Sequence, residues 1–392
     1  MAFFSVVIPT HQRLHLLQEA IQTIVRQDFR DWELIVFDNG STEPVREHVA
    51  SLNDDRVRYQ RSDEFLPVTQ SWNRAIDYAN GDYVILLGDD DGLAPHYFSE
   101  VAAVTARFNQ PDIVYCALYQ FLHPGVAPWE PSGYVSDVKN GFFFTQRSEP
   151  FLLSRDEARK AVLGSLHLRR NFTFNMQAFA FSKTFLSKLR QDGPVFTSPF
   201  PDYYLANTAF ARSESTVIIP QPLTIAGVSK ASFGFTLFNS LESAGEAVLN
   251  ARIVDDPLYP EIAAKLLPGP AYNTNYAITM EHVARATRDE FGAKVAWGRY
   301  RRLQIFSALL SQGDLSPQMA NALTPLERLW AIVMRGLLGL TKRSAFLRGR
   351  LQPILDRSVS PYAFRPIERM CRKGGFSGAT EVYEALELGV IA

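Results

Sequence analysis

Short apolar runs alternate with segments of helical periodicity along residues 4–95, and this alternation restricts the folds open to the chain. Residues 4–8 form a strand-like run closed by Pro9, and apolar residues then recur at helical spacing from Leu14 to Val25. Further strands are expected at 32–37, weakly at 57–59, and at 83–87, with an amphipathic helix at 68–79. Strands that alternate with helices predict an α/β fold, with a mostly parallel central sheet flanked by helices.

Polar side chains stand at the carboxyl ends of the expected strands. Thr10 follows the first strand, Asp38 follows the second, and the triplet of Asp89, Asp90 and Asp91 follows the strand at 83–87. In parallel sheets these ends meet at one edge, and ligands bind beyond that edge. We therefore expect these residues to converge on one site although they are far apart in sequence.

The acidic triplet lies in a turn between Gly88 and Gly92. Three adjacent carboxylates repel one another, so solvent or a divalent cation is needed to balance their charge. The alternative is a solvated acidic turn that caps a following helix, whose first turn would include Pro95.

Composition narrows the function classes. Lys and Arg number 40 against 41 Asp and Glu, so the chain has no general attraction for nucleic acid. Cys116 lies in an apolar run, and Cys371 is the second of only two cysteines, so we expect reduced thiols in a cytoplasmic setting. Because the N-terminus lacks signal-peptide features and no apolar run approaches ~20 residues, we expect a soluble or peripheral protein.

The pattern changes along the chain and predicts two regions. Residues 1–235 carry the strand and helix alternation, and residues 236–392 are mainly helical. Residues 119–175 are irregular and rich in aromatics, which indicates an insertion that shapes a binding site. An apolar stretch at 329–340 precedes basic residues that continue to Arg350. It predicts a helix that either lies on an anionic membrane surface, through residues 329–350, or is buried in an ordinary core.

Several pieces of the chain, in this order and spacing, resemble family 2 glycosyltransferases, which have the Rossmann-like GT-A fold. The pieces are residues 7–10 with Arg13, residues 36–42, residues 72–75 with 81–83, and residues 87–95. The resemblance covers residues 1–235 and implies a GT-A domain there, with residues 119–175 on the acceptor side. It also implies an inverting transfer of a sugar, from a UDP- or dTDP-sugar, to an acceptor hydroxyl.

The resemblance assigns the donor pocket. Asp38 would accept a hydrogen bond from the ring N–H of a uracil or thymine base, and Pro9, Thr10 and Arg13 would line the same pocket. Asn73 would contact the donor. The alternatives are a turn-forming Asp38 ahead of Asn-Gly, a solvated Arg13 and an Asn73 on the helix surface.

The same resemblance implies a divalent cation, Mn²⁺ or Mg²⁺. Asp90 matches the residue that usually binds the metal directly, and Asp89 would lie toward the ribose or the metal. Asp91 would support the site from outside or cap a helix. The chain departs from the family at Gly88, where the first Asp of an Asp-x-Asp motif is often found.

Asp202 is the expected catalytic base. It follows Pro201 where the family often has Glu-Asp, and by the resemblance it would take the proton from the acceptor hydroxyl. A surface-turn Asp after Pro is the alternative.

The implied partners are a nucleotide-sugar donor and a carbohydrate, lipid-linked or protein acceptor in bacterial glycan biosynthesis. A nucleotidyltransferase is one alternative, although a Gly-rich phosphate loop does not follow the first strand. The other is a non-catalytic nucleotide-sugar-binding protein, because Gly88 and Pro201 depart from the family pattern.

Overall fold

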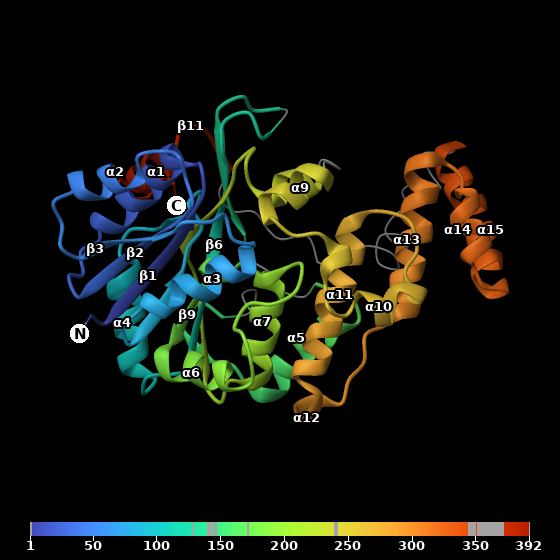
Figure 1. Cartoon of the computed structure of the whole chain (residues 1–392), viewed down its shortest axis with the longest axis horizontal. Coiled ribbons are helices and arrows are strands. Elements are labelled where there is room, and N and C mark those ends of the chain that lie inside the picture. Colours follow the sequence, from blue (N-terminus) through green and yellow to red (C-terminus); the bar gives the residue numbers. More distant parts are fainter. Residues whose placement is uncertain are drawn as a thin grey trace.

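The computed structural model describes residues 2–127, 129–138, 143, 147–170, 172–238, 242–343, 350 and 372–391. Its centre is a mixed sheet with strand order β11-β7-β6-β9-β4-β1-β2-β3 (Figure 1). The parallel part comprises β1 (Phe4–Thr10), β2 (Trp32–Asn39), β3 (Val57–Ser62) and β4 (Tyr83–Leu86). The expected α/β fold, with a parallel sheet built by the N-terminal strands, is confirmed.

Both faces of the inner strands β1 and β4 are covered, which explains why these strands are nearly continuous apolar runs. In β1, Val6 and Ile8 pack into the core beneath α1 (Leu14–Val25) and α4 (Tyr97–Arg107). Val7, between them, faces the opposite core beneath α3 (Val68–Ala75). The alternation of side chains along a strand therefore divides one apolar run between two cores. The remaining helical pieces here are α2 (Val45–Ser51) and η1 (Ile76–Tyr78).

An antiparallel part extends the sheet beyond β4. Strand β9 (Phe179–Ser182) lies between β4 and β6 (Ile113–Leu122) and is antiparallel to both. Strand β10 (Thr216–Val228) runs parallel to β6 and also pairs with β5 (Gly92–Leu93), just after the acidic triplet. Residues 119–175, expected to be irregular, contain regular elements: β7 (Gly133–Val138), β8 (Phe151–Leu152) and α5 (Arg155–Leu166).

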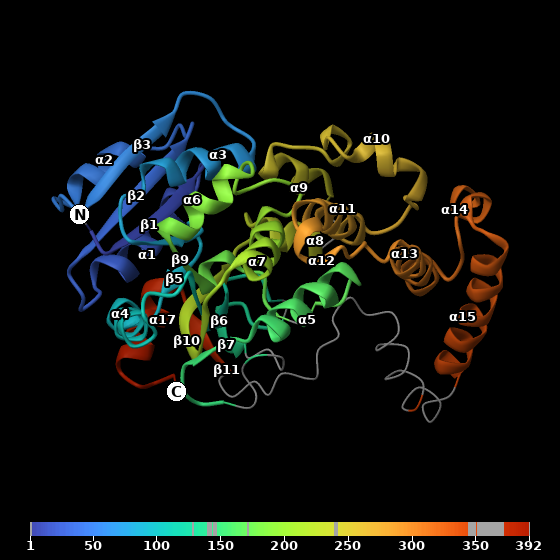
Figure 2. The ribbon, with the colours of Figure 1, turned by 90° about the horizontal axis from the view of Figure 1, so that it is seen from below.

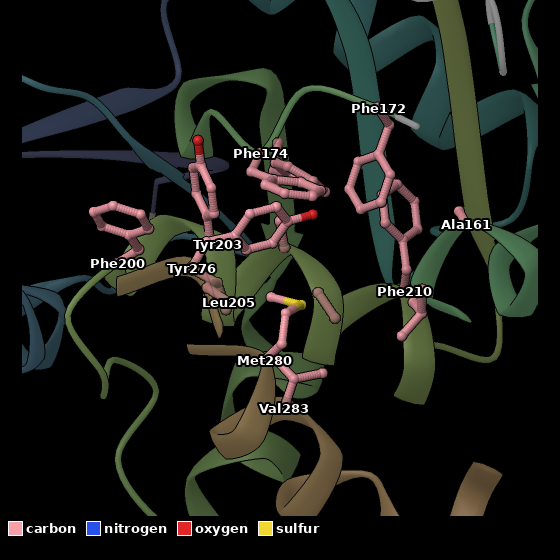
Figure 3. Close-up of a cluster of buried hydrophobic side chains, with 14 of the residues drawn as sticks. Ala161, Phe172, Phe174, Phe200, Tyr203, Leu205, Phe210, Tyr276, Met280 and Val283 are labelled. Atoms are coloured by element: carbon pink, nitrogen blue, oxygen red, sulfur yellow. The ribbon is translucent and has the colours of Figure 1, made fainter. Parts of the chain in front are cut away.

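The helical region shares a core with the sheet domain. Rings of Phe174, Tyr203 and Tyr276 meet there, with centroids 4.5 Å apart for Phe174 and Tyr203 and 5.5 Å apart for Tyr203 and Tyr276 (Figure 3). Tyr203 belongs to α7 (Pro201–Arg212) and Tyr276 to α11 (Ala271–Ala286). This cluster joins the two regions into one apolar core.

Helices account for most of the described chain after β10, and α14 and α15 lie farthest from β1–β3 (Figures 1 and 2). The elements are α8 (Phe233–Phe238), α9 (Glu242–Leu249), η3 (Ile253–Asp255), α10 (Tyr259–Ile262), η4 (Ala263–Lys265), α12 (Arg288–Phe291), α13 (Trp297–Gln312), α14 (Pro317–Ala322) and α15 (Pro325–Arg343). Two short pieces precede them within the sheet domain, η2 (Met176–Ala178) and α6 (Lys183–Gln191).

The C-terminal end of the chain returns to the sheet. Strand β11 (Arg372–Phe376) pairs antiparallel with β7, and α17 (Ala379–Glu387) packs beside α1 (Figures 1 and 2). The hydroxyl of Tyr383 donates to the Arg26 carbonyl at 3.1 Å, and Arg26 forms an ion pair with Glu384 at 2.7 Å. Residues 372–391 therefore belong to the sheet domain, because their apolar side chains cover an edge of the sheet that the N-terminal elements leave open.

Phe376→Ala tests this C-terminal attachment. Phe376 is 7% exposed and packs with Phe121, Val135 and Ile225, so its removal is expected to destabilise the protein by about 3 kcal/mol. Leu388→Ala is the control, because Leu388 is 77% exposed and its loss should change stability by less than about 0.5 kcal/mol. Urea unfolding followed by tryptophan fluorescence measures both, and equal midpoints would contradict the attachment.

Candidate active site

The three carboxylates after β4 point to different partners. Asp89 is 1% exposed, and its Oδ2 accepts a hydrogen bond from Thr10 Oγ1 at 2.7 Å and an ion-pair contact from Arg13 Nε at 3.1 Å. Burial raises the pKa of Asp89, and the charge of Arg13 lowers it. The structure thus brings together Thr10, Arg13 and Asp89, from the ends of β1 and β4, as their strand positions predicted.

The carboxylate of Asp91 fixes the loop that carries the acidic triplet. Its Oδ1 accepts hydrogen bonds from Gln177 Nε2 at 2.9 Å and Gly227 N at 2.8 Å, and its Oδ2 accepts one from Gly88 N at 2.8 Å. Burial raises the pKa of Asp91, while the N–H groups of Gly227 and Gly88 lower it. A Cβ on Gly88 would lie 2.6 Å from Asp91 Oδ2. Gly88 is therefore required by the bond to Asp91, which accounts for the departure from the family's Asp-x-Asp.

Only one of the two carboxylate oxygens of Asp90 accepts a hydrogen bond from a described residue. Its Oδ2 accepts from Ser229 Oγ at 2.9 Å, and its main-chain carbonyl accepts from His123 Nε2 at 2.9 Å. Across the residues that the structure describes, none donates a hydrogen bond to Asp90 Oδ1. Asp89 Oδ1 likewise accepts no hydrogen bond from another described residue, since Thr10 and Arg13 both contact Oδ2. Of these two oxygens, Asp90 Oδ1 belongs to the more exposed residue, because Asp90 is 9% exposed and Asp89 1%.

The carboxylate oxygens of the triplet fit a cation that is bound partly by a ligand better than a cation that is bound by protein groups alone. No group of three or more His, Cys, Asp or Glu side chains comes together for a metal within the described part of the chain. Asp90 offers one carboxylate oxygen, and Mg²⁺ is commonly held by one or two carboxylates together with substrate phosphates. Thr10 and Arg13 both contact Asp89 Oδ2, and Asp89 is 1% exposed, so the expectation that Asp89 helps to bind the metal stays a prediction.

Asp38 is fully buried at the end of β2. Its Oδ1 accepts from Ser41 N at 2.7 Å, and its Oδ2 accepts from Tyr59 Oη at 2.7 Å and from Arg61 Nη1 at 2.6 Å. The sequence reasoning missed Tyr59 and Arg61. The weak strand expected at 57–59 could have indicated them. Strand β3 pairs in parallel with β2, and this pairing places Arg61 opposite Asp38.

A stacked pair closes the same edge of the sheet. The rings of His11 and Phe65 lie 3.9 Å apart at 13°, and His11 Nδ1 donates to the Asn39 carbonyl at 2.9 Å. Asn39 in turn exchanges two hydrogen bonds, each 3.0 Å, with the main chain of Leu66. Pro9 lies opposite Phe37 in the β1 and β2 pairing and leads directly to Thr10. These contacts fix the side chains at the edge of the sheet beyond β1 and β2.

Asn73 lies on α3 and has a positioning role. Its Nδ2 donates to the carbonyls of Thr69 and Phe196, at 2.8 and 2.7 Å, and its Oδ1 accepts from Phe196 N at 3.1 Å. The amide is used to tie α3 to the segment that precedes α7. The expectation that Asn73 contacts a donor stays a prediction beside this internal role.

Asp202 occupies the first turn of α7 and is partly buried. Burial raises its pKa to about 6, against the opposing effects of a main-chain hydrogen bond and the nearby charge of Arg170. Arg170 contacts Asn175 Oδ1 at 3.4 Å, and the η2 segment that follows supplies Gln177 to Asp91. One short segment thus connects the acidic triplet with Asp202, which the sequence did not indicate.

Gly227→Ala tests the close approach of β10 to the triplet. A Cβ on Gly227 would lie 1.7 Å from the Asp90 carbonyl oxygen, so the backbone must shift and stability should fall by about 1–3 kcal/mol. Gly298→Ala in α13 is the matched control, because its added Cβ meets nothing within 4 Å. Unfolding midpoints in urea that do not differ between the two variants would contradict this packing.

The sequence of this chain is similar to those of known proteins. Residues 5–169 match the model of glycosyl transferase family 2. Over 134 residues the chain is 32% identical to a putative colanic acid biosynthesis glycosyl transferase, WcaA, of Escherichia coli, covering 32% of this chain and 48% of that protein. Over 96 residues it is 38% identical to a GalNAc(5)-diNAcBac-PP-undecaprenol beta-1,3-glucosyltransferase of Campylobacter jejuni, covering 24% of this chain and 31% of that one. The chain thus spans less than half the length of either relative.

A crystal structure of residues 1–349 of TarS from S. aureus is similar at 15% identity, with a TM-score of 0.44 over 79% of each chain. Asp202, Gly227 and Ser229 lie beyond the residues matched by the family model. Over residues 5–169, this chain is therefore similar to glycosyl transferase family 2.

Proposed function

We propose that the protein is an inverting glycosyltransferase that moves a sugar from a UDP- or dTDP-sugar to an acceptor hydroxyl in bacterial glycan biosynthesis. The family 2 domain and the two named relatives support this class of reaction. The observation that carries the proposal is the Oδ1 of Asp90, which accepts no hydrogen bond from the described residues and lies in a loop braced by Asp89 and Asp91 at the carboxyl edge of the sheet.

The nucleotide occupies the pocket beyond β1 and β2. Asp38 accepts the ring N–H of the uracil or thymine base, and Tyr59 and Arg61 fix the orientation of its carboxylate. Thr10 and Arg13 form the side of the pocket nearest the diphosphate, where Arg13 is anchored by Asp89. A carboxylate with two anchored oxygens presents its remaining lone pairs in a fixed direction, which favours recognition of one base edge.

Asp90 is the residue that would hold Mn²⁺ or Mg²⁺. Its Oδ2 is fixed by Ser229 and its Oδ1 is available. When bound, such a cation would neutralise the charge that develops on the departing diphosphate. Arg13, which lies beside Asp89, supplies a second positive charge from the chain itself.

Asp202 acts as the general base. The acceptor oxygen attacks the anomeric carbon from the side opposite the diphosphate, its proton passes to the Asp202 carboxylate, and the bond from the anomeric carbon to the diphosphate oxygen breaks. Burial raises the pKa of Asp202 to about 6, which makes this carboxylate a stronger base than a solvated Asp and keeps it ionised near neutral pH.

The acceptor is a carbohydrate, lipid-linked or protein hydroxyl, and a peripheral membrane contact through residues 329–350 remains part of the proposal. Helix α15 buries Ala331 and Met334 and exposes Leu329, Ile332 and Val333 on another side. Residues 344–349 lie outside the described part of the chain. Among the described helices, none combines the length and apolarity needed to cross a bilayer.

A cytoplasmic setting is expected from the use of cysteine, with Cys116 buried as a free thiol and Cys371 outside the described residues.

Isothermal titration with a panel of nucleotide sugars, with and without Mn²⁺, tests the proposal. Wild-type protein should bind a UDP- or dTDP-sugar more tightly with Mn²⁺ and hydrolyse it slowly. Asp202→Asn should bind that donor with nearly unchanged affinity but lose about 100-fold or more of the hydrolysis rate, because only the base is removed. Tight donor binding without turnover in the wild type would favour a non-catalytic binding protein, and retained turnover in the variant would refute the role of Asp202.

The pH dependence of turnover is a separate test. The Asp202 carboxylate must be ionised to accept a proton, and its pKa is about 6. The rate should therefore be level above pH 6 and fall about tenfold per pH unit below it. Because this pKa is raised in the folded state, ionisation of Asp202 lowers stability as the pH rises through 6, so Asp202→Asn should be at least as stable as wild type at pH 8. A rate that stays level down to pH 5 would contradict the assignment.

A further inference from the structure

A cleft of about 650 Å³ lies between the sheet domain and the helical region. Its first wall consists of residues 67–70 at the start of α3 and residues 197–199 before α7. Its second wall consists of α9, residues 249–253 and 255–257, and the start of α11. Among the described residues of 119–175 none lines the cleft, whereas the described part of the helical region forms one of its walls.

The cleft adjoins the proposed catalytic groups on two sides. Residues 197–199 lead through Phe200 into the first turn of α7, which carries Asp202. Phe233 lines the cleft a few residues after Ser229, the residue that anchors Asp90, and its ring lies 5.5 Å from that of Phe200. A molecule in the cleft therefore lies beside the elements that position both Asp90 and Asp202.

Asn275 supplies an unsatisfied polar atom in this lining. The residue is 9% exposed, and its Oδ1 is buried without a hydrogen-bond partner among the described residues. Buried amide oxygens are almost always paired, because desolvation without a partner costs free energy. This oxygen can only accept, so it calls for a ligand that donates, such as a hydroxyl or an acetamido N–H.

The charge of the lining selects against anions. Glu246, Asp255 and Asp256 line the cleft together with a single described cation, Arg252. Arg252 forms an ion pair with Asp255 at 2.9 Å, and Asp256 is bound to His282 at 2.9 Å. No unpaired cation therefore remains in the described lining to bind a phosphate, sulfate or carboxylate group. Apolar Phe233, Leu249 and Ile253 between these polar groups match the mixed surface of a sugar ring.

We propose that this cleft binds an uncharged saccharide unit of the acceptor, and that Asn275 Oδ1 accepts a hydrogen bond from one of its hydroxyl or acetamido groups. The inference rests on the proposed glycosyltransferase function and specifies its acceptor. It excludes acceptors that present phosphate, sulfate or uronic acid groups at this position. Asn275 is thereby a specificity-determining residue rather than a catalytic one.

The test uses the full chain on a panel of immobilised glycans that contains uncharged, phosphorylated, sulfated and uronic-acid-bearing members. Wild type should retain uncharged glycans, and Asn275→Ala should weaken that binding by about tenfold or more. Asn321→Ala, on an exposed position of α14, is the matched control and should change nothing. Binding confined to anionic glycans, no retained glycan, or unchanged binding by Asn275→Ala would overturn the inference.

Two further measurements keep the outcomes separate. Glu246→Lys alters an exposed side chain, should fold normally, and should admit anionic glycans that wild type rejects; unchanged rejection would count against the charge argument. Donor affinity is measured by calorimetry on each variant and should stay at the wild-type value. Absent donor binding in the wild type would refute the proposed function, whereas intact donor binding with glycan binding insensitive to Asn275 would refute the acceptor site alone.

Discussion

The hydrogen bonds of Asp91 hold together the segments from which the site is built. One carboxylate accepts from Gln177 in η2, from Gly227 in β10 and from Gly88 in its own loop. These donors come from distant parts of the sequence, and together they offset the cost of burying the charge. Both glycines follow from this arrangement, because a side chain on Gly88 would strike Asp91 and one on Gly227 would strike the Asp90 carbonyl. The loop therefore has one conformation, in which the Oδ1 of Asp90 is left without a protein donor.

Three adjacent residues of the same type thus perform three different tasks because their neighbours differ. Asp89 anchors Arg13, Asp91 braces the loop, and Asp90 is fixed by Ser229 through one oxygen. Burial raises the pKa of Asp202 to about 6, and it raises the pKa of Asp89 to about 6 as well, although the charge of Arg13 opposes the shift there. What separates the two carboxylates is their contacts, because Asp89 is tied to Thr10 and Arg13 whereas Asp202 stands in the first turn of α7.

The helical region contributes to the site by forming the second wall of the cleft beside it. Asn73 ties α3 to the segment before α7, and the aromatic contact between Phe174, Tyr203 and Tyr276 fixes α7 against α11 (Figure 3). These contacts set the position of Asp202 relative to Asn275, which lies on α11. The helical region, which lies beyond the residues 5–169 matched by the family model, therefore forms one wall of the proposed acceptor site, as expected where a shared fold serves different substrates.

The sequence by itself determined the parallel strands, the helices between them and the residues at the strand ends, because buried strands and amphipathic helices carry local periodic signals. It thereby located Thr10, Arg13, Asp38 and the triplet. The partners of these residues had no local signal: Gln177, Gly227 and Ser229 act through pairing across β9 and β10, and Arg61 through its register opposite Asp38. Residues 372–391 likewise joined the sheet only through tertiary contacts, since β11 is a short strand of basic and glycine residues without apolar alternation. Tertiary structure decided which carboxylate oxygens of the triplet stay free, because hydrogen bonds between distant segments, and not residue type, engage the others.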